Sequence, residues 1–256
     1  LIGGLAGDAL TDSDYNVALG DQALSSDTLG SRSIAIGHAA LFTQNFTTAT
    51  NSYNTAIGFS TGQTITTGVQ NTLIGSNNAI DLISGNYNTT LGYLALYEDQ
   101  YGSNSVAVGY GALQNQRFTT ATNCNNTAVG YSAGNAVTTG VQNTIIGGEA
   151  GDALQTGANN TIVGYHAGNA LTGATNTFLG KEAGAGINSG GSNICIGANA
   201  TVATASTSDA ITIGNGINTA HDEFAFGKPS NVVTNEFDTD ANWSRSSDER
   251  LKKNIT

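Results

Sequence analysis

A short pattern of apolar residues closed by a glycine recurs along the whole chain. Its consensus is Asn-Thr-x-aliphatic-Gly, and successive closing glycines are mostly 17 residues apart, with two steps of 21. These ladder glycines are Gly3, Gly20, Gly37, Gly58, Gly75, Gly92, Gly109, Gly130, Gly147, Gly164, Gly180, Gly197, Gly214 and Gly227. This period is too short for a strand, a helix and two loops, but it suits two short strands and two turns. The pattern therefore predicts an all-β fold, a parallel β-solenoid (β-roll) with coils of about 17 residues.

The positions around each ladder glycine predict which side chains are buried. The residue before the glycine is aliphatic in every repeat up to Ile213, and Phe226 takes that place in the last repeat, so we expect this position to be buried. The residue two places earlier shares its face, because side chains alternate along a strand. The residue between them varies from Ala35 to Phe178. This indicates that both faces of the strand are covered.

Further columns of the repeat predict how the coils stack. Alanine is frequent three residues after the ladder glycine, and an aliphatic residue is frequent seven residues after it. An asparagine column, which we expect to form an amide ladder along the axis, contains Asn54, Asn71, Asn88, Asn126, Asn143, Asn160 and Asn176. Both 21-residue steps carry the sequence Phe-Thr-Thr-Ala-Thr-Asn, at 46–51 and 118–123. A block of four coils has therefore been duplicated.

One such coil encloses only about three inward side chains, so a single chain has a thin interior. Runs such as Ser-Ile-Ala-Ile-Gly at 33–37 are apolar on both faces, and the second face needs another apolar surface. Small middle residues such as Ala56 and Ala128 would let copies of the chain approach one another around a common axis. We therefore expect a rotationally symmetric homo-oligomer.

Composition and charge exclude several classes of function. Charged residues make up 11% of the chain, and the net charge is -11. An acidic surface repels phosphate, which argues against nucleic-acid binding. No apolar run is long enough to span a membrane, so we expect no membrane insertion. The sequence carries no nucleophile-elbow, phosphate-loop or dinucleotide-binding pattern, so we expect neither an enzyme nor a cofactor. Because the chain begins inside the repeat at Leu1, we expect it to be a fragment.

Two repeats carry a family resemblance. The segments Asn-Ser-Val-Ala-Val-Gly-Tyr-Gly-Ala (104–112) and Asn-Thr-Ala-Val-Gly-Tyr-Ser-Ala-Gly (126–134) resemble the head repeats of trimeric autotransporter adhesins, and similar arrays occur in phage tail-fibre proteins. The resemblance covers roughly residues 1–227. It implies a left-handed parallel β-roll that forms a homotrimer about its long axis.

The C-terminal residues 246–255, Ser-Ser-Asp-Glu-Arg-Leu-Lys-Lys-Asn-Ile, resemble the start of the endosialidase-type intramolecular chaperone. The resemblance implies self-cleavage between Ser247 and Asp248 after trimerisation, with Ser247 as the nucleophile and Lys252 as its base. A serine hydroxyl needs such a base, because it is a poor nucleophile at its own pKa. The alternative is an ordinary helix start, since Ser-Asp-Glu is a capping sequence.

These observations predict a structural fibre protein. We expect a homotrimeric tail-fibre-like shaft or head, extracellular or at a virion surface, that presents a region for a host glycan or protein receptor. A bacterial trimeric surface adhesin is the alternative, and a polysaccharide depolymerase is a third candidate without a supporting motif. The predicted regions are a β-roll shaft or head at 1–227, a capping or transition segment at 228–247, and the start of a truncated chaperone domain at 248–256.

The remaining candidate residues have simpler interpretations. His38, His166 and His221 stand alone, without a second type of ligand at metal spacing, and we interpret each as a polar turn residue rather than a metal site. Cys124 and Cys195 are four coils apart, about 19 Å along the axis, too far for a disulfide. Cys195 occupies the variable middle position of the strand, so we expect it to be a buried free thiol.

Aromatic residues follow the ladder glycine in several repeats: Phe59, Tyr93, Tyr110, Tyr131 and Tyr165. In consecutive coils Tyr93, Tyr110 and Tyr131 would stack as a ladder along one edge. Their exposed rings could bind sugar faces, but we favour side-by-side stacking that stabilises the turn.

Overall fold

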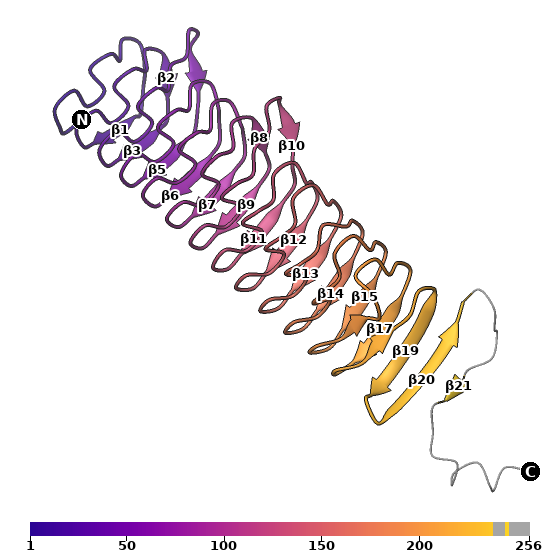
Figure 1. Ribbon diagram of the computed structural model, residues 1–256. Helices are drawn as coiled ribbons and strands as arrows, with labels where there is room; N and C mark the ends of the chain where they lie inside the picture. The colour runs from indigo at the N-terminus through magenta and orange to yellow at the C-terminus, as the bar shows by residue number, and fades with distance from the viewer. Residues whose placement is uncertain (238–243, 246–256) are drawn as a thin grey trace, which may run out of the picture.

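The computed structural model describes residues 1–237 and 244–245 of the 256-residue chain. These residues form an elongated parallel β-solenoid, in which each coil adds one short strand to a single long sheet (Figure 1). The predicted all-β parallel β-solenoid, with coils of about 17 residues, is thus confirmed. Across the described ranges, none of the chain forms a helix long and apolar enough to cross a membrane.

The strands of the main sheet follow one another along the rod. They are β1 (Val17–Leu19), β3 (Ile34–Ile36), β5 (Thr55–Ile57), β6 (Thr72–Ile74), β7 (Thr89–Leu91), β9 (Val106–Val108), β11 (Thr127–Val129), β12 (Thr144–Ile146), β13 (Thr161–Val163), β14 (Thr177–Leu179), β15 (Ile194–Ile196), β17 (Ile211–Gly214), β19 (Glu223–Lys228), β20 (Asn231–Glu236) and β21 (Ser244–Arg245). From β1 to β19 all neighbours pair in parallel, and equivalent repeat positions face one another.

Most coils contain one strand rather than the two that the period suggested. Three short two-stranded ladders add a second strand locally: β2 (Gly30–Ser31) with β4 (Thr50–Asn51), β8 (Gly102–Ser103) with β10 (Thr122–Asn123), and β16 (Thr201–Val202) with β18 (Asn218–Thr219). Elsewhere the chain turns through residues with left-handed backbone angles, as at Asn159, His166 and Gly168. These angles bend the chain sharply and interrupt regular strand geometry.

The core contradicts the burial expected for the strand residues. The middle residue of each strand points inward and is buried, from Ala18 to Ala225, whereas the aliphatic residue before each ladder glycine points outward. Leu91, for example, keeps 48% of its surface exposed. The prediction that this aliphatic column is buried within the chain was therefore wrong. The small middle residues fill the interior and cannot mediate an approach between copies.

In several coils the size of the middle residue is balanced by another buried position. Next to Ala35 and Ala107 a buried leucine lies fourth after the ladder glycine, Leu41 and Leu113 respectively. Next to Ala56 and Ala128 that position is glycine. Where the middle residue is Phe178, that position is Gly184, and a Cβ there would lie within 3.0 Å of the Phe178 ring. Large and small residues thus exchange places in several coils to keep the interior close-packed.

The predicted asparagine ladder is confirmed. The side-chain oxygen of Asn71 accepts a hydrogen bond from the backbone N–H of Asn88 at 2.9 Å, and the Asn71 amide donates to the carbonyl of Gly85 at 2.9 Å. The same pairing recurs from Asn126 through Asn193. Each buried amide therefore satisfies backbone groups of the neighbouring coil, which would otherwise be costly to bury.

The duplicated block replaces the aliphatic residue seven places after the glycine with a buried polar cluster. In the second copy, Gln116 donates to Asp99 at 2.6 Å and to Ser105 at 3.1 Å, and Asn126 donates to Gln116 at 2.8 Å. Asp27, Gln44, Ser33 and Asn54 make the equivalent bonds in the first copy. Burial raises the pKa of Asp99, while hydrogen bonds from Gln116 and the backbone oppose that shift. The cluster therefore supplies the side-chain hydrogen bonds of the asparagine ladder in the coils where serine replaces asparagine.

The ladder glycines are required by the spacing of the coils. Each has φ between 125° and 150°, a region that only glycine adopts readily. A Cβ on any of them from Gly3 to Gly214 would lie within 3.0 Å of the carbonyl oxygen of the next ladder glycine. Both the positive φ and the close approach between coils therefore require glycine at these positions.

The solenoid changes its pairing after β19. This strand pairs in parallel with β17 on one side and antiparallel with β20 on the other, through the register Phe226 to Val233. The hairpin covers the edge that the last parallel strand would expose, and an uncovered edge can pair with another chain.

We expect Gly147→Ala to lower the free energy of unfolding by at least about 2 kcal/mol, because it combines a strained φ with a backbone overlap at Gly164. Gly148→Ala is the matched control, since its Cβ would meet only the Tyr165 ring at an ordinary 3.5 Å. Urea unfolding of both variants measures the difference. Equal losses in the two variants would contradict the role of the ladder.

Both cysteines are buried free thiols, as predicted for Cys195, and burial raises the pKa of each to about 12. We expect neither to react with iodoacetamide at pH 8 in the folded protein, and both to react in denaturant, because the thiolate is the nucleophile. The unfolded chain loses the thiol protons near the ordinary value of 9.0, so their contribution to stability declines between pH 9 and about 12. Mass spectrometry after alkylation checks the reactivity. Rapid native labelling of either thiol would contradict it.

Candidate functional surfaces

The largest apolar feature of the surface is a stripe along the main sheet. We define the aliphatic stripe as the residues that precede the ladder glycines: Leu19, Ile36, Ile57, Ile74, Leu91, Val108, Val129, Ile146, Val163, Leu179, Ile196, Ile213 and Phe226. In-register parallel pairing stacks them in a single column. Thr55, Thr72 and Thr89 belong to a second outward column beside it, and from β1 to β17 neither outward column contains a charged side chain.

The aliphatic stripe is large for an uncovered surface. Coils rise by about 4.8 Å and three strand residues span about 10 Å, so the stripe and its threonine border measure on the order of 600 Å². Monomeric soluble proteins rarely expose contiguous apolar patches larger than a few hundred Å². In a chain with a net charge of -11, a charge-free face of this length is a candidate interaction surface.

The predicted aromatic ladder forms in the structure. Tyr110 lies between Tyr93 and Tyr131, with ring centroids 5.7 Å and 5.4 Å away. His38 and Phe59 stack in the same column near the N-terminal end, 5.1 Å apart. About half of each tyrosine side chain is exposed, and Tyr110 has a neighbouring ring on both sides. A sugar packs on a free ring face, so the geometry favours the stabilising role over sugar binding.

The residues predicted for self-cleavage, Ser247, Asp248 and Lys252, lie outside the described residues. Trp243, the only tryptophan of the predicted transition segment, also lies outside them. The candidate functional surfaces of the described ranges are therefore the aliphatic stripe, the aromatic column and the surroundings of the histidines.

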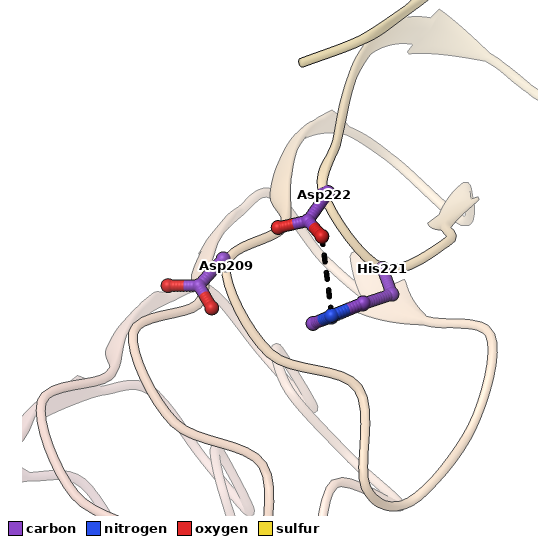
Figure 2. Close-up of side chains that lie close together, drawn as sticks. All are labelled: Asp209, His221 and Asp222. Carbon is purple, nitrogen blue, oxygen red and sulfur yellow. Dashed lines mark ion pairs between the residues drawn. The ribbon is translucent and has the colours of Figure 1, made fainter. Parts of the chain in front are cut away.

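The structure gives each histidine an acidic neighbour. His38 lies 3.7 Å from Asp21, and His166 contacts Glu149. His221 differs from both, because its imidazole and the carboxylates of Asp209 and Asp222 offer ligand atoms within 4.8 Å of one another (Figure 2). The expectation that His221 has no second ligand type at metal spacing was therefore wrong.

The sequence contains a signal for this cluster, but the signal is visible only when positions are counted from the ladder glycines. Asp209 and Asp222 both occupy the fifth position before a ladder glycine, Gly214 and Gly227 respectively. The coil between them is the shortest, so the two carboxylates do not share the common 17-residue spacing. Only the stacked structure shows that they occupy equivalent places in adjacent coils.

No protein-family model, no curated protein and no solved structure matches this chain.

Proposed function

We propose that this chain is a structural fibre protein that forms a homotrimer, in which the three aliphatic stripes pack against one another along the long axis. The fibre would resemble the shaft or head of a phage-type tail fibre, at a virion surface or otherwise outside the cell. It would hold a region that binds a host glycan or protein receptor. The single observation that carries the proposal is the uncharged aliphatic stripe.

Packing of three chains around one axis explains why both outward columns of the main sheet are uncharged. An aliphatic column with a threonine border can lie near the axis, where three copies exclude water from it. A flat partner would instead have to offer a matching stripe of the same length. Another copy of this chain offers such a stripe, because the repeat gives every copy the same spacing between coils.

The available area suits a stable assembly. Three stripes of about 600 Å² would together bury on the order of 1,800 Å², within the usual range for specific interfaces. The acidic side chains would remain on the outer faces, where water screens their repulsion. Stacked coils with paired backbone groups make a rigid rod, which is the property a fibre needs to hold a receptor-binding region away from its base.

The proposal includes a maturation step, which rests on the resemblance of residues 246–255 to the start of a chaperone domain. A chaperone domain would assemble the trimer and then be released by hydrolysis of the Ser247–Asp248 peptide bond, which consumes one water. Ser247 would act as nucleophile and Lys252 as base. Fusing the chain to a chaperone domain of this type tests the step by mass spectrometry, because Ser247→Ala would leave the fusion intact.

We expect sedimentation to give a mass of three chains, 3 × 26.0 kDa or about 78 kDa, at micromolar concentration. Ile146→Asp should weaken association at least tenfold, because it places a charge in the centre of the aliphatic stripe. Thr139→Asp is the matched control, since Thr139 is exposed outside the main sheet. A wild-type chain that sediments as a 26.0 kDa monomer would refute the proposal.

We expect Tyr110→Ala to lower the free energy of unfolding by about 1 kcal/mol, because it removes two ring contacts. Tyr87→Ala is the control, since Tyr87 is exposed and stacks on no ring within the described part of the chain. A glycan array compares binding by the same variants. Loss of glycan binding in Tyr110→Ala, with oligomeric state retained, would instead assign the aromatic ladder to receptor recognition.

A further inference from the structure

The strongest unassigned cluster of chemically active side chains lies near the C-terminal end of the solenoid. Asp209 and Asp222 stack in adjacent coils, both with left-handed backbone angles, and His221 directly precedes the second of them. Figure 2 shows the three side chains gathered beside the same turns. Their ligand atoms lie within 4.8 Å of one another, and two of the residues are exposed to solvent.

The shortest hydrogen bond of His221 indicates which ring nitrogen is available. Nδ1 lies 2.7 Å from the carbonyl oxygen of Ser208, while the Ser208 N–H approaches the same nitrogen only at 3.4 Å. A carbonyl oxygen can only accept, so Nδ1 carries the proton in this contact. In a neutral imidazole the other nitrogen, Nε2, then presents its lone pair. A backbone carbonyl on the second nitrogen is the arrangement that orients metal-binding histidines.

In the neutral ring Nε2 faces a second acceptor, whereas a protonated ring forms an ion pair there. Nε2 lies 3.1 Å from Oδ2 of Asp222, and the Asp209 carboxylate adds another negative group. Two facing acceptors repel each other unless a positive charge lies between them. A proton on Nε2 would satisfy Asp222 alone, whereas a metal cation would contact all three groups.

The donor set indicates the class of cation. One imidazole nitrogen and two carboxylate oxygens, with a remaining position open to water, suit the tetrahedral coordination of zinc. Calcium and magnesium prefer sites built from oxygen alone. Zinc ligands at about 2.1 Å lie about 3.4 Å apart, and rotation of these solvent-accessible side chains can close the difference from 4.8 Å.

We propose that Asp209, His221 and Asp222 form a binding site for one zinc ion per chain, which links two adjacent coils at the end of the solenoid. The ion would join the coil of Asp209 to the coil of Asp222 where the repeat shortens and the parallel stacking ends. The site does not depend on the proposed trimer, because all three ligands come from one chain.

Isothermal titration of the EDTA-stripped chain with Zn²⁺ at pH 7.5 tests the site. We expect one Zn²⁺ per chain, and a rise in the melting temperature when Zn²⁺ is added, because an ion that binds only the folded state stabilises it. Asp209→Asn and His221→Gln should each weaken the binding at least tenfold. Millimolar Ca²⁺ should not raise the melting temperature.

The matched control is His38→Gln, which removes an exposed histidine that has a single acidic neighbour, Asp21. It should bind Zn²⁺ as the wild type does. Equal melting temperatures in EDTA would show that each variant folds, and a Zn²⁺-dependent shift of the His221 Nε2 resonance gives a second measurement on the wild type. The proposal fails if millimolar Zn²⁺ does not bind, if the two site variants bind unchanged, or if His38→Gln loses as much affinity.

Discussion

The close approach of successive coils at the ladder glycines is the constraint on which the rest of the structure depends. Each ladder glycine faces the carbonyl of the next, so any side chain there would push two coils apart. Such a displacement would break the parallel hydrogen bonds of the main sheet and the amide bonds of the asparagine ladder together. Because each coil contacts only its neighbours, the same backbone path has to be repeated along the rod.

The interior keeps the coil spacing constant by compensating changes in side-chain volume and in hydrogen bonding. Apolar volume is exchanged between the middle of the strand and the fourth residue after the glycine, as Ala35 with Leu41 and Phe178 with Gly184 show. Polar groups are compensated similarly, because Gln116 and Asp99 complete the hydrogen bonds where Ser105 replaces an asparagine. Individual positions can therefore vary widely while the spacing of the coils stays constant.

The outer surface is organised by the same register. Residues at one outward repeat position line up along the rod, so a single position can create the aliphatic stripe, the aromatic ladder or a stacked pair of carboxylates. The aliphatic stripe is the basis of the proposed self-association, since each copy would carry the same line of residues with the same spacing. At Asp209 and Asp222 stacking instead concentrates negative charge beside His221, which favours a bound cation.

The sequence by itself determined the repeat, the parallel all-β class, the asparagine ladder, the stacked tyrosines and the free thiols, because each follows from residues at fixed offsets that stacking brings into line. It did not determine which face of the strand is the inner one. Alternation divides Thr144, Ile145 and Ile146 into two faces, but both faces are apolar enough to be buried. The tertiary structure decided this, since only the path of the turns places Ile145 inside and Ile146 outside. It also brought Asp209 to His221, because the length of the intervening coil, rather than the local sequence, sets their contact.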